Sequence, residues 1–127
     1  MSYSVLVVDD EFRNREMLRM MLEIMGYIVF EAEDGIDALA KVAENRPDVM
    51  ILDVMMPNMD GITLCKQLRS QPETADLPII MLSGKTHDSA IQEGLEAGAN
   101  QYMKKPMAAQ ELLANVKALA SRTPAIV

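Results

Sequence analysis

Short, unbroken apolar runs alternate along this chain with longer segments of helical periodicity, and this alternation constrains the fold more than any other feature. The segments between the runs carry apolar residues at i, i+3 and i+4 spacing, as with Leu18, Met21 and Leu22. Strands that alternate with helices join by right-handed crossovers, so the pattern predicts a parallel sheet with helices on both faces. The strong runs are residues 5–8, 49–52 and 79–82, and the weaker runs are 28–30 and 101–103.

The predicted fold class is α/β, with a five-stranded parallel sheet in the order 2-1-3-4-5 (flavodoxin-like, doubly wound). Runs without polar residues suit strands that are buried on both faces. The first, third and fourth runs are therefore expected at the centre, and the weaker second and fifth at the edges. The connections reverse direction between strands 1 and 3, and ligands of such sheets bind beside that switch point, at the carboxyl ends of the strands.

A helix is expected after each strand. The first should span about residues 13–25, with methionines filling core space and Gly26 just beyond its end. Asp34 is expected to cap the second helix, and the fourth should span about residues 87–97. The residues expected to face the core are Met17, Leu18, Met20, Met21, Leu22 and Met25 in the first helix, Ile36, Leu39 and Val42 in the second, Ile62, Cys65 and Leu68 in the third, Ile91 and Leu95 in the fourth, and Leu112, Leu113, Val116 and Leu119 in the last.

Polar side chains follow the apolar runs at ends that should share one edge of the sheet. They are Asp9, Asp10, Asp53, Ser83 and Lys105. Carboxylate oxygens suit a hard divalent cation such as Mg²⁺, and a hydroxyl and an ammonium suit a phosphoryl group. Taken singly, each residue also has an ordinary interpretation as a helix cap, a turn residue or a solvated side chain. Taken together, they predict a cation-assisted phosphorylation site.

Composition narrows the class of protein further. A chain of 127 residues is long enough for one domain with a core, and its formal charge of −7 argues against binding to nucleic acid or to an anionic membrane. The single cysteine, Cys65, excludes an internal disulfide and favours a reducing compartment. No apolar stretch approaches the roughly 20 residues of a membrane span. We therefore expect a cytoplasmic protein with no direct nucleic-acid or membrane partner.

Motifs occur in a fixed order at the expected strand ends. They are Val8-Asp9-Asp10, Leu52-Asp53, the loop 56–61, Ser83-Gly84 and Tyr102-Met103-Lys104-Lys105-Pro106. Each is common alone, but in this order and spacing they resemble the receiver domain of two-component response regulators. The resemblance extends over residues 1–121 as one receiver domain and leaves 122–127 as a C-terminal tail or linker.

The resemblance implies that Asp53 is the phosphoacceptor. It also implies a Mg²⁺ ion, with Mn²⁺ as a substitute. Asp10, Asp53 and the backbone carbonyl of Met55 would hold this ion directly, whereas Asp9 would act through water. A bulky Met55 beside the phosphoryl group is expected to hinder the attacking water and to give a persistent acyl phosphate.

The remaining roles concern the phosphoryl oxygens and the switch. Lys105 is expected to pair with these oxygens and Ser83 to donate its hydroxyl to them, while Lys104 points away. The Lys105–Pro106 peptide is expected to be cis. Tyr102 occupies the position of the family's switch aromatic, so phosphorylation should move it from exposed toward buried and change the face formed by the fourth helix, fifth strand and fifth helix.

The implied partners are a sensor histidine kinase or a histidine phosphotransfer protein, and a downstream output domain or target protein. A monomer or weak dimer is expected, because Asn100, Gln101 and Asn115 replace residues that are charged in many dimerising relatives. The chain is expected to catalyse only its own phosphorylation and dephosphorylation.

Two other functions stay open from the sequence. One is a Mg²⁺-dependent small-molecule phosphatase or phosphotransferase, although Asp9-Asp10-Glu11-Phe12 does not fit the Asp-x-Asp pattern of such enzymes. The other is a phosphorylation-independent docking domain, although degenerate receivers of that kind usually lack one of the key residues.

Overall fold

Strands and helices alternate through the whole described part of the chain. The computed structural model describes residues 2–56, 59–84 and 87–121, so part of the loop 56–61 and the predicted tail 122–127 lie outside the described residues. The elements are β1 (Ser4–Val8), α1 (Phe12–Ile24), β2 (Ile28–Ala32), α2 (Gly35–Glu44), β3 (Val49–Asp53), α3 (Gly61–Arg69), β4 (Ile79–Ser83), α4 (Asp88–Glu96), β5 (Gln101–Lys104) and α5 (Ala109–Ala120).

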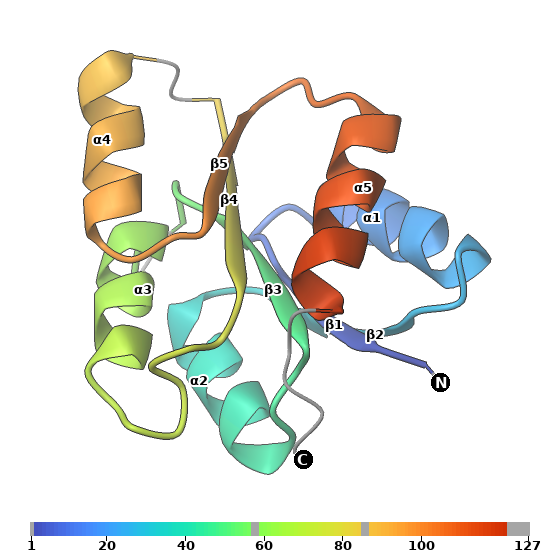
Figure 1. The fold of residues 1–127 in the computed structure, drawn as a ribbon, viewed down its shortest axis with the longest axis horizontal. Helices are drawn as coiled ribbons and strands as arrows, with labels where there is room; N and C mark the ends of the chain where they lie inside the picture. Colours follow the sequence, from blue (N-terminus) through green and yellow to red (C-terminus); the bar gives the residue numbers. More distant parts are fainter. Residues whose placement is uncertain (1, 57–58, 85–86, 122–127) are drawn as a thin grey trace.

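The five strands form one parallel sheet in the order β2-β1-β3-β4-β5, which confirms the predicted topology (Figure 1). Every residue of β3 and β4 is buried, as expected for central strands made of unbroken apolar runs. The edge strands β2 and β5 are partly exposed. The predicted distinction between central and edge strands is therefore confirmed.

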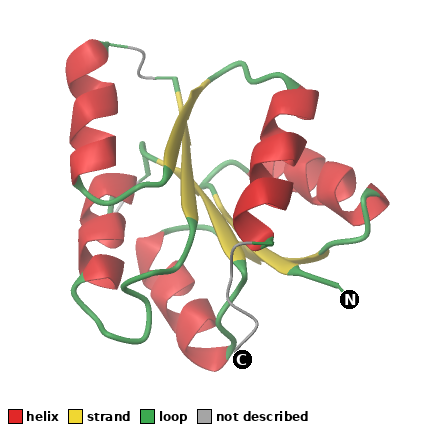
Figure 2. Ribbon diagram, viewed as in Figure 1, coloured by secondary structure: helices red, strands yellow, loops and turns green. Residues whose placement is uncertain are grey.

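Helices cover both faces of the sheet, with α1 and α5 on one face and α2, α3 and α4 on the other (Figure 2). Successive strand residues point to opposite faces, so the apolar runs supply two separate cores. In β1, Val5 and Val7 pack with the α1 and α5 side, whereas Leu6 and Val8 pack with the α2 and α3 side. Cys65 lies fully buried in the second of these cores, as expected.

The methionines in and just after α1 fill the core only in part: Met21 packs against it, as predicted, but the others do not. Leu18 and Leu22 form the buried face of this helix, while Met17, Met20 and Met25 are 46–59% exposed. Leu18 and Leu22, with Met21 beside them, pack on this face of the sheet, which leaves the other three thioethers on the outer side. The prediction that Ile36 faces the core was also wrong, because Ala38 and Val42 form the buried face of α2. Leu95, predicted to face the core from α4, is exposed as well, because Gly94 is the buried residue of that helix.

The ends of the helices follow the predicted local signals. Asp34 caps α2 by accepting a hydrogen bond from the backbone N–H of Asp37 at 2.8 Å. Gly26, just beyond α1, has φ +93°, a backbone conformation that residues other than glycine rarely adopt. Asp60 caps α3 in the same way as Asp34 caps α2, although the turn-rich sequence of the loop 56–61 indicates only a turn at this position.

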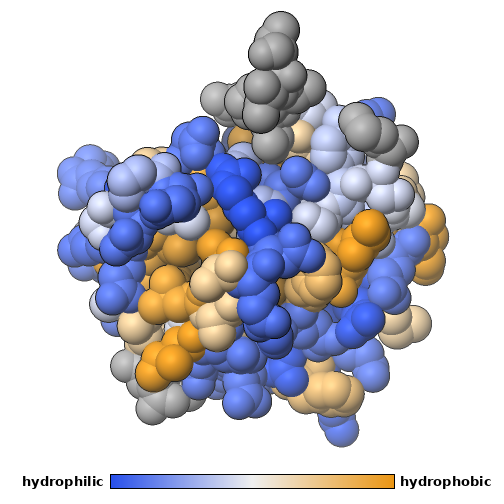
Figure 3. All heavy atoms as spheres, turned by 90° about the horizontal axis from the view of Figure 1, so that it is seen from below, coloured by the Kyte–Doolittle hydropathy of each residue, from blue (hydrophilic) through white to orange (hydrophobic). Residues whose placement is uncertain are grey.

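The surface at the end of the molecule opposite the site is mixed. Figure 3 shows apolar patches interrupted by charged and polar side chains on that end. Among the described residues, no helix is both long and apolar enough to cross a membrane.

Candidate functional site

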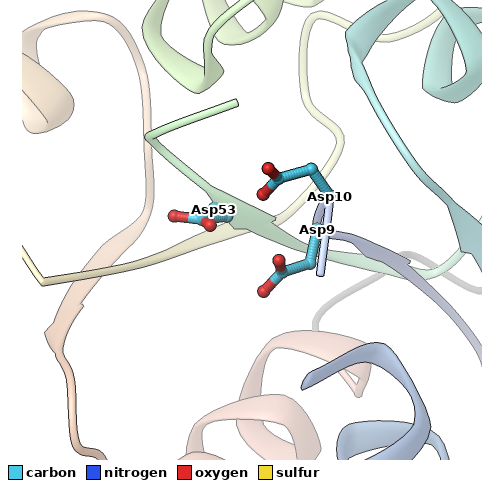
Figure 4. A group of neighbouring side chains, drawn as sticks. All are labelled: Asp9, Asp10 and Asp53. Atoms are coloured by element: carbon cyan, nitrogen blue, oxygen red, sulfur yellow. The ribbon is translucent and has the colours of Figure 1, made fainter. Parts of the chain in front are cut away.

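Three carboxylates meet at the carboxyl ends of β1 and β3, beside the switch point of the sheet. Asp9 and Asp10 follow β1, and Asp53 is the last residue of β3; one oxygen of each lies within 4.8 Å of the others (Figure 4). Asp9 and Asp53 are buried, whereas Asp10 is exposed. The structure thus brings together the three acids that the strand-end pattern placed at one edge.

The carboxyl group of Asp53 is held from two sides. Its Oδ1 accepts a hydrogen bond from the backbone N–H of Met55 at 3.2 Å, and its Oδ2 lies 3.5 Å from Nζ of Lys105. Burial raises the pKa of Asp53 above its ordinary value, and the charge of Asp9 acts in the same direction, although Lys105 opposes both. The site therefore holds more negative charge than its own residues neutralise.

Lys105 reaches the acids from beyond β5. Its Nζ also lies 3.5 Å from Oδ2 of Asp9, so one ammonium serves two buried carboxylates. The backbone N–H of Lys105 donates to the carbonyl oxygen of Ser83 at 2.8 Å, and the Lys105–Pro106 peptide is cis, as predicted. Lys104 is exposed, which agrees with the choice of Lys105 as the residue of the site.

Ser83 and Tyr102 lie on β4 and β5, the paired strands at this edge of the sheet. Ser83 is the last residue of β4, is fully buried and pairs with Lys104 in the register of β4 and β5. Tyr102 pairs with Met81 in the same register and is partly buried against the core. Ser83 therefore ends the fourth strand and Tyr102 lies in the fifth, as predicted.

Asp9 is fixed by neighbours that the sequence analysis did not single out. Its Oδ1 accepts from the backbone N–H of Glu11 at 2.9 Å, and its backbone carbonyl accepts from Nη1 of Arg15 at 2.7 Å. Arg15 in turn pairs with Glu31 of β2 at 3.2 Å. Nothing in the sequence marks this arginine out from Arg13 and Arg19 of the same helix, because its partners are distant in the chain or lie outside the helix.

Gly61 is a second residue whose importance the sequence did not reveal. A Cβ atom at this position would lie 2.5 Å from the backbone oxygen of Asp53 and 2.8 Å from Cα of Val54. The backbone N–H of Gly61 also donates to the carbonyl oxygen of Val54 at 2.9 Å. Glycine thus lets the start of α3 lie directly against the end of β3, where Asp53 is presented.

The chemistry of the donor set fits a hard divalent cation. Mg²⁺ prefers oxygen ligands, keeps several waters and needs one or two protein carboxylates, and three carboxylates converge here with one exposed to solvent. A groove of about 500 Å³ with mainly apolar walls opens beside Asp9 and Lys105, between α1 and the start of α5. The acidic cluster is therefore reachable from outside the protein.

The fold and site together define a class: a doubly wound α/β domain with a cation-compatible acidic site at its switch point. The family model of the response regulator receiver domain matches residues 5–117. The chain therefore belongs to the response regulator receiver domain family. It is a receiver domain of a two-component system, and the cluster of Asp9, Asp10 and Asp53 fits the phosphorylation site of that family.

Individual relatives agree with this assignment. The chain is 49% identical over 123 residues to the response regulator MprA from Mycobacterium ulcerans (strain Agy99), a match that covers 97% of this chain and 52% of that protein. The chain thus spans about half the length of this relative. A crystal structure from Chloroflexus aurantiacus J-10-fl that is assigned to the response regulators is 43% identical, with a TM-score of 0.92, covering 96% of this chain and 100% of that one.

A third relative bears on the metal. The receiver domain of the sensor histidine kinase PA1611 from Pseudomonas aeruginosa PAO1 is 28% identical, with a TM-score of 0.87, covering 95% of this chain and 99% of that one. That structure holds a magnesium ion coordinated in its active-site cleft. The fit of our donor set to Mg²⁺ therefore agrees with what a structural relative binds.

Proposed function

We propose that Asp53 accepts a phosphoryl group from a phosphohistidine on a sensor histidine kinase or a histidine phosphotransfer protein. One observation carries the proposal: the Asp53 carboxylate lies at the carboxyl end of a central strand, among two further carboxylates and 3.5 Å from an ammonium. The downstream partner is an output domain or a target protein. The chain acts as a monomer or weak dimer, in the reducing cytoplasm that the single buried Cys65 suits.

The transfer forms one bond and breaks another. A carboxylate oxygen of Asp53 attacks phosphorus, the bond from phosphorus to the imidazole nitrogen breaks, and the electron pair stays on that nitrogen. The product is an acyl phosphate on Asp53. Because phosphoryl transfer passes through a loose transition state, positioning and charge neutralisation supply most of the catalysis. The chain catalyses only this step and the later hydrolysis by water.

The ammonium of Lys105 supplies the positive charge that belongs to the protein. It lies between Asp9 and Asp53, so a phosphoryl group on Asp53 would draw it away from the carboxylates toward the new oxygens. Ser83 ends the neighbouring strand and donates its hydroxyl to the same group. The backbone bond from Lys105 to Ser83 keeps the two residues together.

Asp10, Asp53 and the backbone carbonyl of Met55 would hold Mg²⁺ directly. Bound there, the ion neutralises charge on the phosphoryl oxygens, and Mn²⁺, which accepts the same oxygen ligands, substitutes for it. Asp9 would act through water, as the family resemblance implies; its Oδ1 accepts from the backbone N–H of Glu11 and its Oδ2 lies beside Lys105. The exposure of Asp10 supports its role as a direct ligand.

Phosphorylation is read out through Ser83 and Tyr102. A phosphoryl group adds about −1.5 to −2 charge and three strong acceptors, so it draws the hydroxyl of Ser83 and the end of β4 inward. Tyr102 then packs more deeply, which changes the face formed by α4, β5 and α5. Support comes from the place of Tyr102 on the strand next to β4, half buried in front of α4.

The proposal is tested by incubating the chain with Mg²⁺ and acetyl phosphate and measuring its intact mass. We expect one phosphoryl adduct in the wild type, none in Asp53→Asn, and a normal adduct in Asp60→Asn. Asp60 is a matched control, because it is an exposed helix cap near the site and asparagine caps helices equally well. An adduct of equal yield in Asp53→Asn would overturn the assignment. Passing the same samples over a sizing column measures any change in assembly.

A further inference from the structure

Gly94 lies in the interior of α4, where the ring of Tyr102 packs against the helix. A Cβ atom at position 94 would lie 2.7 Å from Cδ2 of Tyr102 and 2.9 Å from Sδ of Met81. Non-bonded carbon atoms pack at about 3.5–4.0 Å. Any side chain at position 94 would therefore force the ring of Tyr102, or α4 itself, to move.

The helix does not need glycine at this position for its own geometry. Gly94 is within the span Asp88–Glu96, and its φ is not in the left-handed region that favours glycine. Glycine is, after proline, the residue least favourable to the interior of a helix, so its presence in this nine-residue helix needs another reason. The close approach of Tyr102 and Met81 is the structural feature that requires a residue without a side chain.

The ring of Tyr102 is confined on two sides. Met81 pairs with Tyr102 in the register of β4 and β5 and is fully buried, so it lies beside Tyr102 on the same face of the sheet. Gly94 is the buried residue of α4, and its backbone faces the ring from the helix side. The ring can occupy its partly buried position because Gly94 has no side chain there.

We infer that Gly94 is the positioning residue for Tyr102: its missing side chain makes room for the buried ring position that phosphorylation selects. The inference rests on the proposed function, in which phosphorylation of Asp53 favours the buried ring. Linkage between two sites is reciprocal. A substitution that excludes the buried ring must therefore also weaken the binding of a phosphoryl group at Asp53.

The test compares wild type with Gly94→Ala by ¹⁹F NMR on protein labelled with fluorotyrosine, with and without Mg²⁺ and beryllofluoride, a phosphoryl analogue. Tyr102→Phe assigns the Tyr102 resonance, and Tyr3 and Tyr27, which pack on the other face of the sheet, serve as internal references. We expect Gly94→Ala to move the Tyr102 resonance toward its exposed position before any addition. We also expect it to lower the affinity for beryllofluoride roughly fivefold or more.

A double-mutant cycle separates the ring from a general effect on the helix. In a Tyr102→Leu background the affinity for beryllofluoride should not respond to Gly94→Ala, because the ring is gone. Ser89→Ala, which places the same residue at an exposed position of α4, should leave the resonance and the affinity unchanged. An equal loss of affinity in the Tyr102→Leu background would overturn the inference. So would an unchanged Tyr102 resonance in Gly94→Ala.

Failure of the inference and failure of the proposed function look different in this experiment. If wild type responds to beryllofluoride and Gly94→Ala responds identically, only the role of Gly94 is wrong. If wild type neither binds beryllofluoride nor shows a change at Tyr102, the proposed phosphoryl site and switch are wrong, and the inference falls with them. Should Gly94→Ala not fold, Gly94→Ala/Tyr102→Leu must fold, and failure of both variants would contradict the inference.

Discussion

Nζ of Lys105 lies 3.5 Å from Oδ2 of Asp9 and 3.5 Å from Oδ2 of Asp53. One ammonium is thus shared between two buried carboxylates, while a third carboxylate, that of Asp10, lies within reach of both. The charge is unbalanced before any phosphoryl group arrives. This imbalance explains why the site fits a divalent cation, and it governs how the metal-free protein should behave.

Replacing Asp53 should stabilise the metal-free protein at neutral pH. Burial raises the pKa of Asp53, and the opposing charge of Lys105 does not cancel this effect. A carboxyl group whose pKa is raised by folding contributes stability below its ordinary pKa and loses that contribution as the pH rises. In EDTA at pH 7, Asp53→Asn should therefore raise the free energy of unfolding by on the order of 1 kcal/mol.

Urea unfolding at pH 7 and at about pH 4, near the ordinary pKa of a carboxyl group, checks this prediction. The gain should shrink at the lower pH, because the carboxyl group of the wild type is then protonated at little cost. Asp60→Asn should leave stability nearly unchanged at both values. A destabilised Asp53→Asn protein at pH 7 would contradict our account of the charge.

Glu31 should show the opposite pH dependence. Burial raises its pKa, but hydrogen bonds from Arg19 at 2.6 Å and Arg15 at 3.2 Å outweigh this effect and lower it overall. A lowered pKa contributes stability above the ordinary value, and this is lost as the pH falls through the folded-state pKa. Glu31→Gln should lose about 1 kcal/mol at pH 7 and nothing at strongly acid pH, whereas the exposed Glu33→Gln should show neither effect.

Asn100 should matter for stability, although it lies on the surface. Its Oδ1 accepts from the backbone N–H of Ile79 at 2.8 Å and from Nη2 of Arg69 at 3.1 Å. Arg69 also donates to the carbonyl oxygens of Gly98 and Thr74, which joins α3 to the turn after α4. Asn100→Ala should therefore cost about 1–3 kcal/mol.

The neighbouring Gln101→Ala is the matched control, because Gln101 is also exposed and lies next in the chain. Its effect on the free energy of unfolding should stay within about 0.5 kcal/mol. Urea denaturation of the two variants side by side decides the matter. Equal losses would mean that the contacts of the Asn100 side chain add nothing.

Met55 should set the lifetime of the acyl phosphate. Its side chain is 58% exposed two residues after Asp53, where it can shield the phosphorus from water. Met55→Ala should speed loss of the phosphoryl group about three- to tenfold, a barrier change of about 1 kcal/mol. Met20→Ala, equally exposed on α1, is the control. An unchanged decay rate, followed by intact mass after removal of the donor, would show that Met55 does not shield the group.

The parts of the fold that depend on local pattern were predictable from the sequence. Unbroken apolar runs located β1, β3 and β4, and the polar residue at the end of each run placed Asp9, Asp53 and Ser83 at one edge of the sheet. Cap residues such as Asp34 were predictable for the same reason, because they act within a few residues of their own position.

Features set by contacts between distant segments were not predictable. The exposure of Met17 and Met20 depends on how much space two leucines already fill against the sheet. The hydrogen bonds of Arg69 to Gly98 and Asn100 join residues about thirty positions apart. No periodic pattern in the sequence predicts such contacts. The sequence also does not show that Gly94 faces the ring of Tyr102, whereas a Cβ atom at Gly26 would have no neighbour within 4 Å.

The central claim is that Asp53 carries the phosphoryl group, and chemical mapping of the modified residue tests it most directly. Borohydride reduces an aspartyl phosphate to homoserine, which marks the position permanently. After treatment with Mg²⁺ and acetyl phosphate, reduction and digestion, mass spectrometry should find homoserine at position 53 and unmodified aspartate at positions 9, 10 and 60. Homoserine at another position, or none at position 53 despite a phosphoryl adduct on the intact chain, would contradict the account.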